Sequence, residues 1–366
     1  MEMRLSEQHP AMILWWGRGD NQYSRNRIIR QLLAHLGYEI RDFRPRFSIL
    51  GDWEAEARVA VRPSLVWVPC FRQRDVLAAA RWSRRRNIPL IFDPLISAYD
   101  KQVNERGKFP ATSRSARRLL TWERRRFLLA NLLVADTASH AAYFCRQFDV
   151  SPRKTAVVMV GAEEGLFRAQ PLALRPDCEP LEVLYYGSFI HLQAPEVIVE
   201  AASLYRGPPV QWTLLGNGPL RARCESSASG LPTVRFEPWI SYDSLPARIH
   251  RADVLLGVFG GGEKAGRVIP NKVFQALACG RPVVTRHADA YPDALRKGGD
   301  HGIFWVQPGD PKALAKTVAD LAARRARLPT VAEQAAKTFQ EFFSYRVIQQ
   351  QLREALDRVF TSPTRL

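Results

Sequence analysis

The sequence has few cysteines, no long apolar run and few acidic residues, and each of these features limits the class of protein to which it can belong. Its five cysteines are scattered and form no C-x-x-C pair, which excludes a disulfide framework or a zinc site and is typical of a reducing cytosol. No apolar run approaches the roughly 20 residues that cross a bilayer. Acidic residues are outnumbered, with 36 Asp and Glu against 53 Lys and Arg in 366 residues, a net charge of +17. We therefore expect a cytoplasmic protein with an anionic partner: nucleic acid, a phosphorylated substrate or an acidic membrane face.

The excess of positive charge lies mainly in the first half of the chain. Residues 1–165 hold 28 basic and 17 acidic side chains, and residues 101–126 hold nine basic side chains against Glu105 and Glu123. From Ser113 this stretch has helical spacing, with apolar residues leaving a basic face. It is either a helix that lies on an anionic membrane, which would place the protein at the inner face of the plasma membrane, or a solvated surface helix.

Apolar runs typical of buried strands alternate with amphipathic helical segments. Such alternation predicts parallel sheets covered by helices on both faces. The pattern restarts near residue 180, so we predict two doubly wound, Rossmann-like α/β domains, residues 1–170 and 171–340, followed by a C-terminal helix over 341–366. Two such domains facing a cleft would bind ligands at the carboxyl ends of their strands. The expected strands are 11–16, 38–43, 64–69, 88–92, 132–135, 181–186, 210–215, 233–236, 254–258, 282–285 and 302–306, with helices over 24–36, 75–86, 195–205 and 333–360.

The most informative segment is Phe259-Gly-Gly-Gly-Glu-Lys-Ala-Gly-Arg-Val-Ile-Pro-Asn-Lys, a strand end, a glycine-rich loop and a helix that opens at Pro270. Glycines let the backbone approach a ligand, and a helix N-terminus offers free N–H groups and partial positive charge. Lys264, Arg267 and Lys272 add three cations. The segment predicts a diphosphate site without a Walker-type lysine, although a flexible basic loop is the alternative.

This segment resembles the donor-binding region of GT-B fold glycosyltransferases, the retaining family 4 group also called glycosyl transferases group 1. The resemblance covers about residues 180–320 and rests on five further matches: Tyr185-Tyr-Gly187, Leu214-Leu-Gly-Asn-Gly218, Val234-Arg-Phe236, Ala252-Asp253 and Ala276-Leu-Ala-Cys-Gly-Arg-Pro-Val-Val284. It implies a metal-independent hexosyltransferase without a cofactor, which uses a UDP- or GDP-linked sugar as co-substrate. It also implies that the terminal helix crosses back onto the first domain.

The chain departs from the family pattern at the residues that contact the donor. The two glutamates of the family's E-x7-E motif fall on Arg267 and Gln275, and the Arg and Lys of its phosphate clamp fall on Ser188 and Gln193. Gln275 would keep one acceptor for the ribose hydroxyls at a cost of about 1–2 kcal/mol of donor affinity. We expect Lys264, Arg267 and Lys272 to replace the clamp, with Arg267 and Lys272 acting on the leaving phosphate.

Further contacts follow from the resemblance. The donor site would include Gly17, Gly187, Ser188, Gly216, Asn217, Trp239, Ile240, Pro270 and Asn271. Trp239 either stacks on the base or belongs to the core. Asp93 stands about where many relatives carry a histidine and either takes the acceptor's proton or caps a turn. The acceptor site would include Asn21, Tyr23, Ser97, Tyr99 and Asp100, whereas His140 is expected to be buried or capping.

The leading hypothesis is a glycosyltransferase that extends a glycan or a lipid-diphosphate-linked acceptor in cell-surface polysaccharide synthesis, with retention implied by the family. A nucleotide-sugar epimerase or hydrolase on the same fold would need clustered carboxylates, which the sequence does not show. A nucleic-acid-binding protein fits the charge but shows no recognition motif. A non-catalytic relative is the fourth alternative, because of Gln275.

Overall fold

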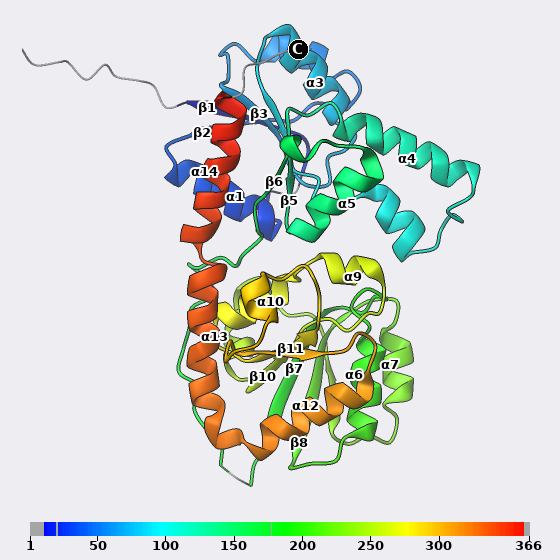
Figure 1. The fold of residues 1–366 in the computed structure, drawn as a ribbon, viewed down its shortest axis with the longest axis vertical. Helices are drawn as coiled ribbons and strands as arrows, with labels where there is room; N and C mark the ends of the chain where they lie inside the picture. Colours follow the sequence, from blue (N-terminus) through cyan, green and yellow to red (C-terminus); the bar gives the residue numbers. More distant parts are fainter. Residues whose placement is uncertain (1–10, 20, 177, 362–366) are drawn as a thin grey trace, which may run out of the picture. The chain divides into compact units, whose positions relative to one another are not determined.

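The structure is a computed structural model that describes residues 11–19, 21–176 and 178–361, and it divides into two compact units. The first unit runs to Val160 and includes the residues from Ile348 onward, and the second spans Gly161–Val347. Each unit has one six-stranded sheet in which all neighbouring strands are parallel, with helices on its faces (Figure 1). The predicted pair of doubly wound α/β sheets is confirmed.

In the first unit the strand order is β2-β1-β3-β4-β5-β6. The central strands are buried along their whole length because helices cover both faces, which is why they read as continuous apolar runs. The strands are β1 Met12–Trp16, β2 Glu39–Phe43, β3 Leu65–Val68, β4 Leu90–Phe92, β5 Leu132–Ala135 and β6 Thr155–Val157. The helices are α1 Ser24–His35, α2 Gly51–Arg58, α3 Val76–Arg85, α4 Arg114–Phe127 and α5 Ala138–Phe148.

In the second unit the order is β12-β11-β10-β7-β8-β9. Its core joins apolar side chains of the central strands to those of α6, α7 and α12. The strands are β7 Leu181–Ser188, β8 Val210–Asn217, β9 Val234–Glu237, β10 Val254–Leu256, β11 Val283–Arg286 and β12 Ile303–Val306. The helices are α6 Pro195–Leu204, α7 Arg221–Ser227, α8 Leu245–His250, α9 Glu263–Arg267, α10 Asn271–Ala278, α11 Asp293–Arg296, α12 Pro311–Ala323 and α13 Leu328–Phe342.

The C-terminal region is two helices rather than the one long helical segment expected over 333–360. α13 ends at Phe342, and α14 begins at Tyr345 and continues to Thr361. Phe343, between them, turns inward and packs its ring against Phe274 at a centroid distance of 5.1 Å. α14 is tied to the first unit, since Gln351 accepts a hydrogen bond from the Met159 N–H (2.9 Å) and Arg358 donates to the Thr155 carbonyl (2.9 Å).

Several elements of the described ranges lie where the sequence analysis expected none. They include α2, a short π-helical segment over Asp100–Glu105, α5, β6, and α9 within the glycine-rich loop. α2 was missed because Trp53 is exposed, so the segment shows no apolar face. Among the described residues no helix is both long and apolar enough to span a membrane.

A pair of glycines lets β7 and β8 run close together at their carboxyl ends. Gly187 and Gly216 are partners in the parallel register, with φ of 150° and 131°. A Cβ on Gly216 would stand 2.1 Å from the Gly187 carbonyl oxygen, far inside van der Waals contact. The backbone conformation and the close approach therefore both require glycine at position 216.

We expect Gly216→Ala to destabilise the protein by about 3 kcal/mol or more, because the methyl group meets backbone and the φ is unfavourable for alanine. The measurement is the free energy of unfolding in urea. The control is Gly165→Ala, since a Cβ there meets nothing within 4 Å, and its effect should stay within about 1 kcal/mol. Equal effects of the two changes would contradict this account.

Candidate functional site

The candidate site of the second unit is built at the carboxyl ends of β7 and β8 and at the start of α10. Lys272 lies in the first turn of α10 and is only 5% exposed. Its Nζ donates to Gln193 Oε1 at 2.7 Å and stands 3.8 Å from the centroid of the Tyr185 ring. A side chain at Gly187 would collide with both partners of this bond, at 2.5 Å from Gln193 Oε1 and 2.8 Å from Lys272 Nζ. Gly187 thus makes room for the lysine.

Burial holds the pKa of Lys272 well below its ordinary value. The neighbours of the amine are a neutral amide and an aromatic face, which favour its charged form less than a carboxylate would. An anionic group bound beside Lys272 would raise this pKa and would gain more from the contact than it would from an exposed lysine. The arrangement is therefore suited to an anion. Gln193 occupies the position at which the sequence analysis found the family's lysine missing, and it now positions Lys272.

The glycine-rich loop is held in place, which argues against the alternative of a flexible basic loop. The guanidinium of Arg286, on β11, donates to the carbonyl oxygens of Gly260 and Gly262, the latter at 3.0 Å. Lys264 and Arg267, on α9 in this loop, are both largely buried. Arg267 also pairs with the exposed Glu263 at 3.2 Å. The sequence analysis missed the role of Arg286, because an arginine 24 residues away gives no local sign of it.

Gln275 is part of a buried chain of hydrogen bonds. Its Oε1 accepts from the Tyr186 hydroxyl at 2.8 Å, and its Nε2 donates to the Tyr242 hydroxyl at 3.0 Å. The Tyr242 hydroxyl in turn donates to the carboxylate of Glu163. The negative charge that the family carries at position 275 is thus found two hydrogen bonds away, on Glu163. Neither Tyr242 nor Glu163 was predicted from the sequence.

The remaining donor candidates have polar or exposed surroundings. Asn217 Oδ1 accepts from the Gly218 N–H at 2.7 Å, which fixes the turn after β8. Trp239 is 52% exposed, and this excludes the alternative that it belongs to the core. Ser188, Ile240, Pro270 and Asn271 are half-buried. Pro270 is the residue before α10, so the expected opening of this helix is correct to within one residue.

In the first unit Asp93 is buried in an ion pair with Arg25. Arg25 Nε stands 2.7 and 3.0 Å from the two carboxylate oxygens, and Arg25 also donates to the Val158 carbonyl at 2.9 Å. The Asp93 side chain is 1% exposed, so an acceptor hydroxyl does not reach it in this structure. The pKa of Asp93 is raised by burial, and Arg25 and the Leu95 backbone N–H oppose this rise. The hydrogen bond from Leu95 supports the turn-capping alternative over that of a base.

Three of the residues predicted for the acceptor site are also buried. Ser97 donates to Glu123 at 2.7 Å, and Glu123 also accepts from the Tyr99 N–H at 2.8 Å. The Asp100 N–H donates to Ser97 Oγ, and Tyr99 packs in the core. Their polar atoms support the loop after β4, and their role at an acceptor site stays a prediction. The expected burial of His140 is confirmed, since its ring lies 2.6 Å from Asp136.

Asn21 and Tyr23, the other acceptor candidates of the first unit, are more accessible, whereas Gly17 is buried. Asn21 donates weakly to Asp42 at 3.4 Å, and the ring of Tyr23 meets that of Phe71 edge-on at 5.0 Å. The Gly17 N–H donates to the Phe43 carbonyl at 2.9 Å. Within the described ranges no three His, Cys, Asp or Glu side chains are grouped so that they could hold a metal ion.

Comparison with known proteins places this geometry in a family. Residues 180–324 match the family "Glycosyl transferases group 1". This segment of the chain is similar to the members of that family. A protein of Escherichia coli K12 named as a colanic acid biosynthesis glycosyl transferase, WcaI, is 36% identical over 113 residues, 30% of this chain and 27% of that protein. The D-inositol 3-phosphate glycosyltransferase of Salinispora tropica is 31% identical over 238 residues, 57% of this chain. The chain spans 48% of that second relative, so it covers less than half of either.

Solved structures share the fold over nearly the whole chain. Sucrose-phosphate synthase from Thermosynechococcus elongatus superposes with a TM-score of 0.71 at 17% identity, over 96% of this chain and 100% of that chain. Anabaena Alr3699/HepE in complex with UDP superposes with a TM-score of 0.68 at 16% identity, over 94% and 99%. The predicted GT-B fold and the family resemblance are confirmed. The roles of the individual site residues stay predictions.

We expect Gln275→Glu to destabilise the fold by about 1–3 kcal/mol, because Tyr242 has one proton to donate and would then face two buried carboxylates. Glu163→Gln alone should cost less than about 1 kcal/mol, since the new side-chain amide still offers a carbonyl acceptor to Tyr242. The double variant Glu163→Gln/Gln275→Glu reverses the direction of the hydrogen bonds and should recover the loss. The free energy of unfolding in urea, measured for all three variants, tests this hydrogen-bonded network. Purely additive effects of the two substitutions would refute the coupling between residues 163 and 275.

Arg25→Met should cost about 3–5 kcal/mol at neutral pH, because it leaves the buried Asp93 without its cation. Removal of Arg25 raises the pKa of Asp93 further above that in the unfolded chain. As the pH falls, Asp93 therefore becomes protonated in the folded variant before it does so in the unfolded chain, which stabilises the folded state. The stability lost in Arg25→Met should accordingly be smaller at about pH 5 than at about pH 8. Urea unfolding at both pH values gives the result. The control is Arg41→Met, because Arg41 forms an exposed ion pair with Glu39. This substitution should change the free energy of unfolding by at most about 1 kcal/mol at either pH.

Proposed function

We propose that the protein is a glycosyltransferase that moves a sugar, with retention, from a nucleotide-sugar donor to a glycan or lipid-linked acceptor of the cell surface. The support for a nucleotide-sugar donor comes from the family match over residues 180–324 and from the cationic, glycine-lined site in the same segment. The solved complexes of Alr3699/HepE with UDP and UDP-glucose favour UDP as the nucleotide. The name of WcaI, which refers to colanic acid biosynthesis, favours a polysaccharide product.

The observation that carries the proposal is the buried amine of Lys272 at the first turn of α10. Loss of a nucleoside diphosphate from a sugar places new negative charge on the leaving phosphate, and a preorganised cation lowers the energy of that transition state. Lys272 is held in place by Gln193 and Tyr185 before any ligand binds, so it loses little side-chain freedom on binding. The free N–H groups at the start of α10 add to the same effect.

The other residues would bind and orient the donor. Lys264 and Arg267 would supply further positive charge from the fixed glycine-rich loop, so no divalent metal is required to balance the diphosphate. Gln275 would offer its remaining carbonyl capacity to a ribose hydroxyl, with Tyr186 and Tyr242 fixing its orientation. Trp239, half exposed, would contact the base. Since Asp93 is buried against Arg25, we assign the removal of the acceptor proton to the departing phosphate.

We expect UDP and UDP-glucose to raise the melting temperature of the protein, and Lys272→Ala to abolish this rise. A ligand at 100 times its Kd stabilises a fold by about 2.7 kcal/mol, which a thermal melt resolves easily. The lysine is buried at the site, so its loss removes the central cation. Transfer of sugar to a crude glycan acceptor, followed by mass spectrometry, should fail for the same variant.

The matched control is Lys297→Ala, because Lys297 is an exposed lysine of the same unit. This variant should keep both the shift and the transfer. Absence of a shift across UDP, GDP and their sugars would refute the nucleotide-sugar proposal. A shift without any transfer would identify a non-catalytic relative, and release of free sugar without acceptor would identify a hydrolase.

A further inference from the structure

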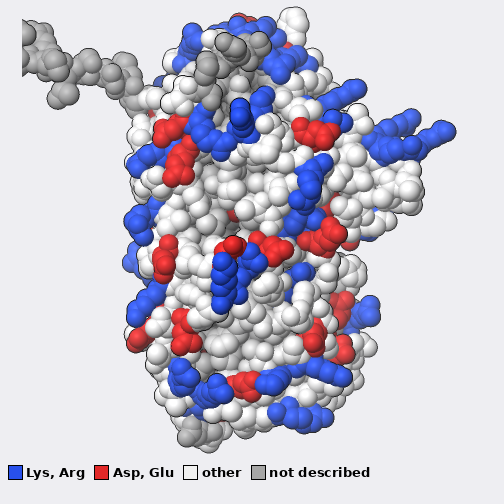
Figure 2. Space-filling view, in the orientation of Figure 1, with Lys and Arg blue, Asp and Glu red and all other residues white. Residues whose placement is uncertain are grey.

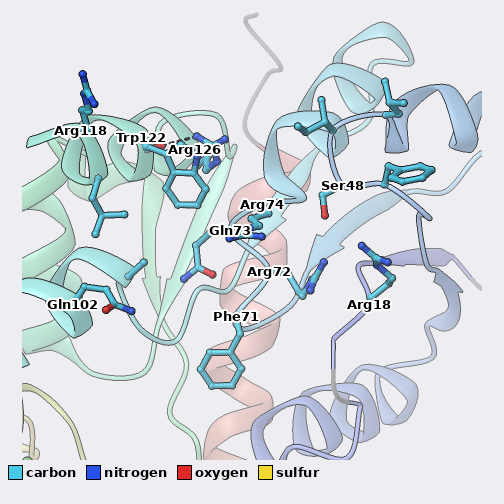
Figure 3. Close-up of a pocket in the computed structure, with 15 residues that line it drawn as sticks. Arg18, Ser48, Phe71, Arg72, Gln73, Arg74, Gln102, Arg118, Trp122 and Arg126 are labelled. Atoms are coloured by element: carbon cyan, nitrogen blue, oxygen red, sulfur yellow. Dashed lines mark hydrogen bonds between the residues drawn. The ribbon is translucent and has the colours of Figure 1, made fainter. Parts of the chain in front are cut away.

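The first unit contains a large open pocket that the donor chemistry does not use. Its volume is about 1320 Å³, and it lies between the segment 47–50, the loop after β3 and one side of α4. Figure 3 shows Trp122 and Arg126 on one side of it and Ser48, Arg72 and Arg18 on the other. Every residue that lines it comes from the first unit, so it is complete within that unit.

The lining of this pocket is strongly and one-sidedly charged. Its lining, as far as the described residues go, contains no aspartate or glutamate and five arginines: Arg18, Arg72, Arg74, Arg118 and Arg126. Arg72 pairs with Asp75, but Arg18, Arg74 and Arg118 are exposed and have no ion-pair partner among the described residues. Five uncompensated or half-compensated guanidinium groups around one cavity repel one another, and a bound anion would relieve that repulsion.

Arg126 is the arginine most clearly prepared for a ligand. Its guanidinium stacks on the ring of Trp122 at 3.8 Å, and one of its terminal nitrogens donates to the Trp122 carbonyl at 2.7 Å. Its Nε is buried and donates no hydrogen bond in the described part of the chain. Its partial burial removes water from the guanidinium and lowers the pKa of Arg126. On the face seen in Figure 2, more basic side chains project where α4 lies.

One edge of the pocket carries an exposed apolar ridge. Phe47, Ile49, Leu50 and Trp53 are 65%, 70%, 53% and 75% exposed, four large apolar side chains within seven residues. Glu54 fixes the ridge by accepting from the backbone N–H groups of Arg46 (2.8 Å) and Phe47 (3.0 Å). Exposed apolar clusters are typical of surfaces that contact a partner or a membrane.

Another apolar residue of the pocket is held in an unfavourable conformation. Phe71 has φ of 65° and is 41% exposed. A phenylalanine in the left-handed region costs about 1–3 kcal/mol and persists where the surrounding structure imposes it. Its ring is held by Tyr23, one of the residues predicted for the acceptor site. Strain and exposure together point to a ligand contact at this position.

We propose that this pocket binds the phosphate or diphosphate headgroup of a membrane lipid, with the ridge 47–53 inserted among the lipid chains. The arginines match the charge and the bidentate geometry of phosphate, and the ridge matches the apolar boundary of a bilayer. Nucleic acid would match the arginines but leave the ridge in water. As an account of the acceptor, the inference rests on the proposed function, but the lipid site can be tested without sugar transfer.

The test is cosedimentation of the full chain with vesicles. One set of vesicles is phosphatidylcholine alone, and the other also contains about 20 mol% phosphatidic acid, a lipid with an exposed phosphate. This share, about one lipid in five, is enough to give the surface a negative potential. We expect binding to the mixed vesicles and little to phosphatidylcholine alone. Arg74→Gln/Arg118→Gln should weaken binding about 30-fold, since each cation near an anionic surface contributes about a fivefold gain in affinity. Ile49→Ser/Trp53→Ser should weaken it at least about tenfold.

Matched controls come from the second unit. Arg223→Gln/Arg251→Gln removes two exposed arginines, and Leu174→Ser/Leu204→Ser removes two exposed leucines. Both should bind like the wild type. Equal losses for pocket and control variants would overturn the proposal in favour of general charge attraction. The thermal shift with UDP, measured on every variant, shows that each is folded and keeps a failure of lipid binding separate from a failure of the donor proposal.

Two further outcomes would overturn the lipid assignment. If inorganic phosphate or pyrophosphate stabilises the wild type but not Arg74→Gln/Arg118→Gln, and vesicles do not bind, the pocket takes a soluble phosphate. If the same variant loses affinity for a DNA duplex while vesicles bind neither protein, the partner is a nucleic acid, and binding should then fall steeply with salt.

Discussion

The close approach of β7 and β8 is the constraint on which the candidate site of the second unit depends. Gly187 and Gly216 face each other across these strands, and the first of them leaves space for the Lys272 amine and its partner Gln193. A side chain at either glycine would push the strands apart or displace the lysine. The fixed loop of α9, held by Arg286, and the hydrogen bonds around Gln275 are arranged beside this one position. The glycines therefore determine where positive charge can be buried.

The positive charge of the chain occurs in two physically different settings. In the second unit Lys272 is buried beside neutral partners, so its interaction with an anion is strong and little screened by salt. In the first unit the arginines around the large pocket are mostly exposed, so each interacts weakly and several must act together. The first arrangement suits a single phosphate group at a defined point. The second suits a partner surface that carries many negative charges. The neighbouring apolar side chains would add affinity through hydrophobic contact, which has no fixed geometry.

Much of the fold could be predicted from the sequence because the central strands are buried on both faces and read as apolar runs, such as 65–68 and 132–135. Side-chain partners could not. The position of Asp93 after a strand indicates the correct edge of the sheet, but only the structure shows that Arg25, 68 residues away, closes over it. Ser97 and Asp100 were assigned to a site for the same reason, but the structure shows that Ser97 donates to Glu123 and accepts from the Asp100 N–H beneath the loop. The ridge 47–53 was missed because an exposed apolar segment has no periodic pattern.

The glutamine at position 275 replaces a glutamate of the family pattern, and the hydrogen bonds around it remain satisfied. A glutamate there would bind ribose hydroxyls through its charge, but it would also lie near Glu163 through the shared Tyr242 hydroxyl. A phenol supplies one proton, so two carboxylates on it cannot both be satisfied, and burial makes the unsatisfied one costly. With glutamine, the amide N–H completes the chain and a single negative charge remains on Glu163. Glutamine at position 275 thus matches the donors and acceptors of the buried network. The cationic part of the site, centred on Lys272, is independent of the negative charge of Glu163.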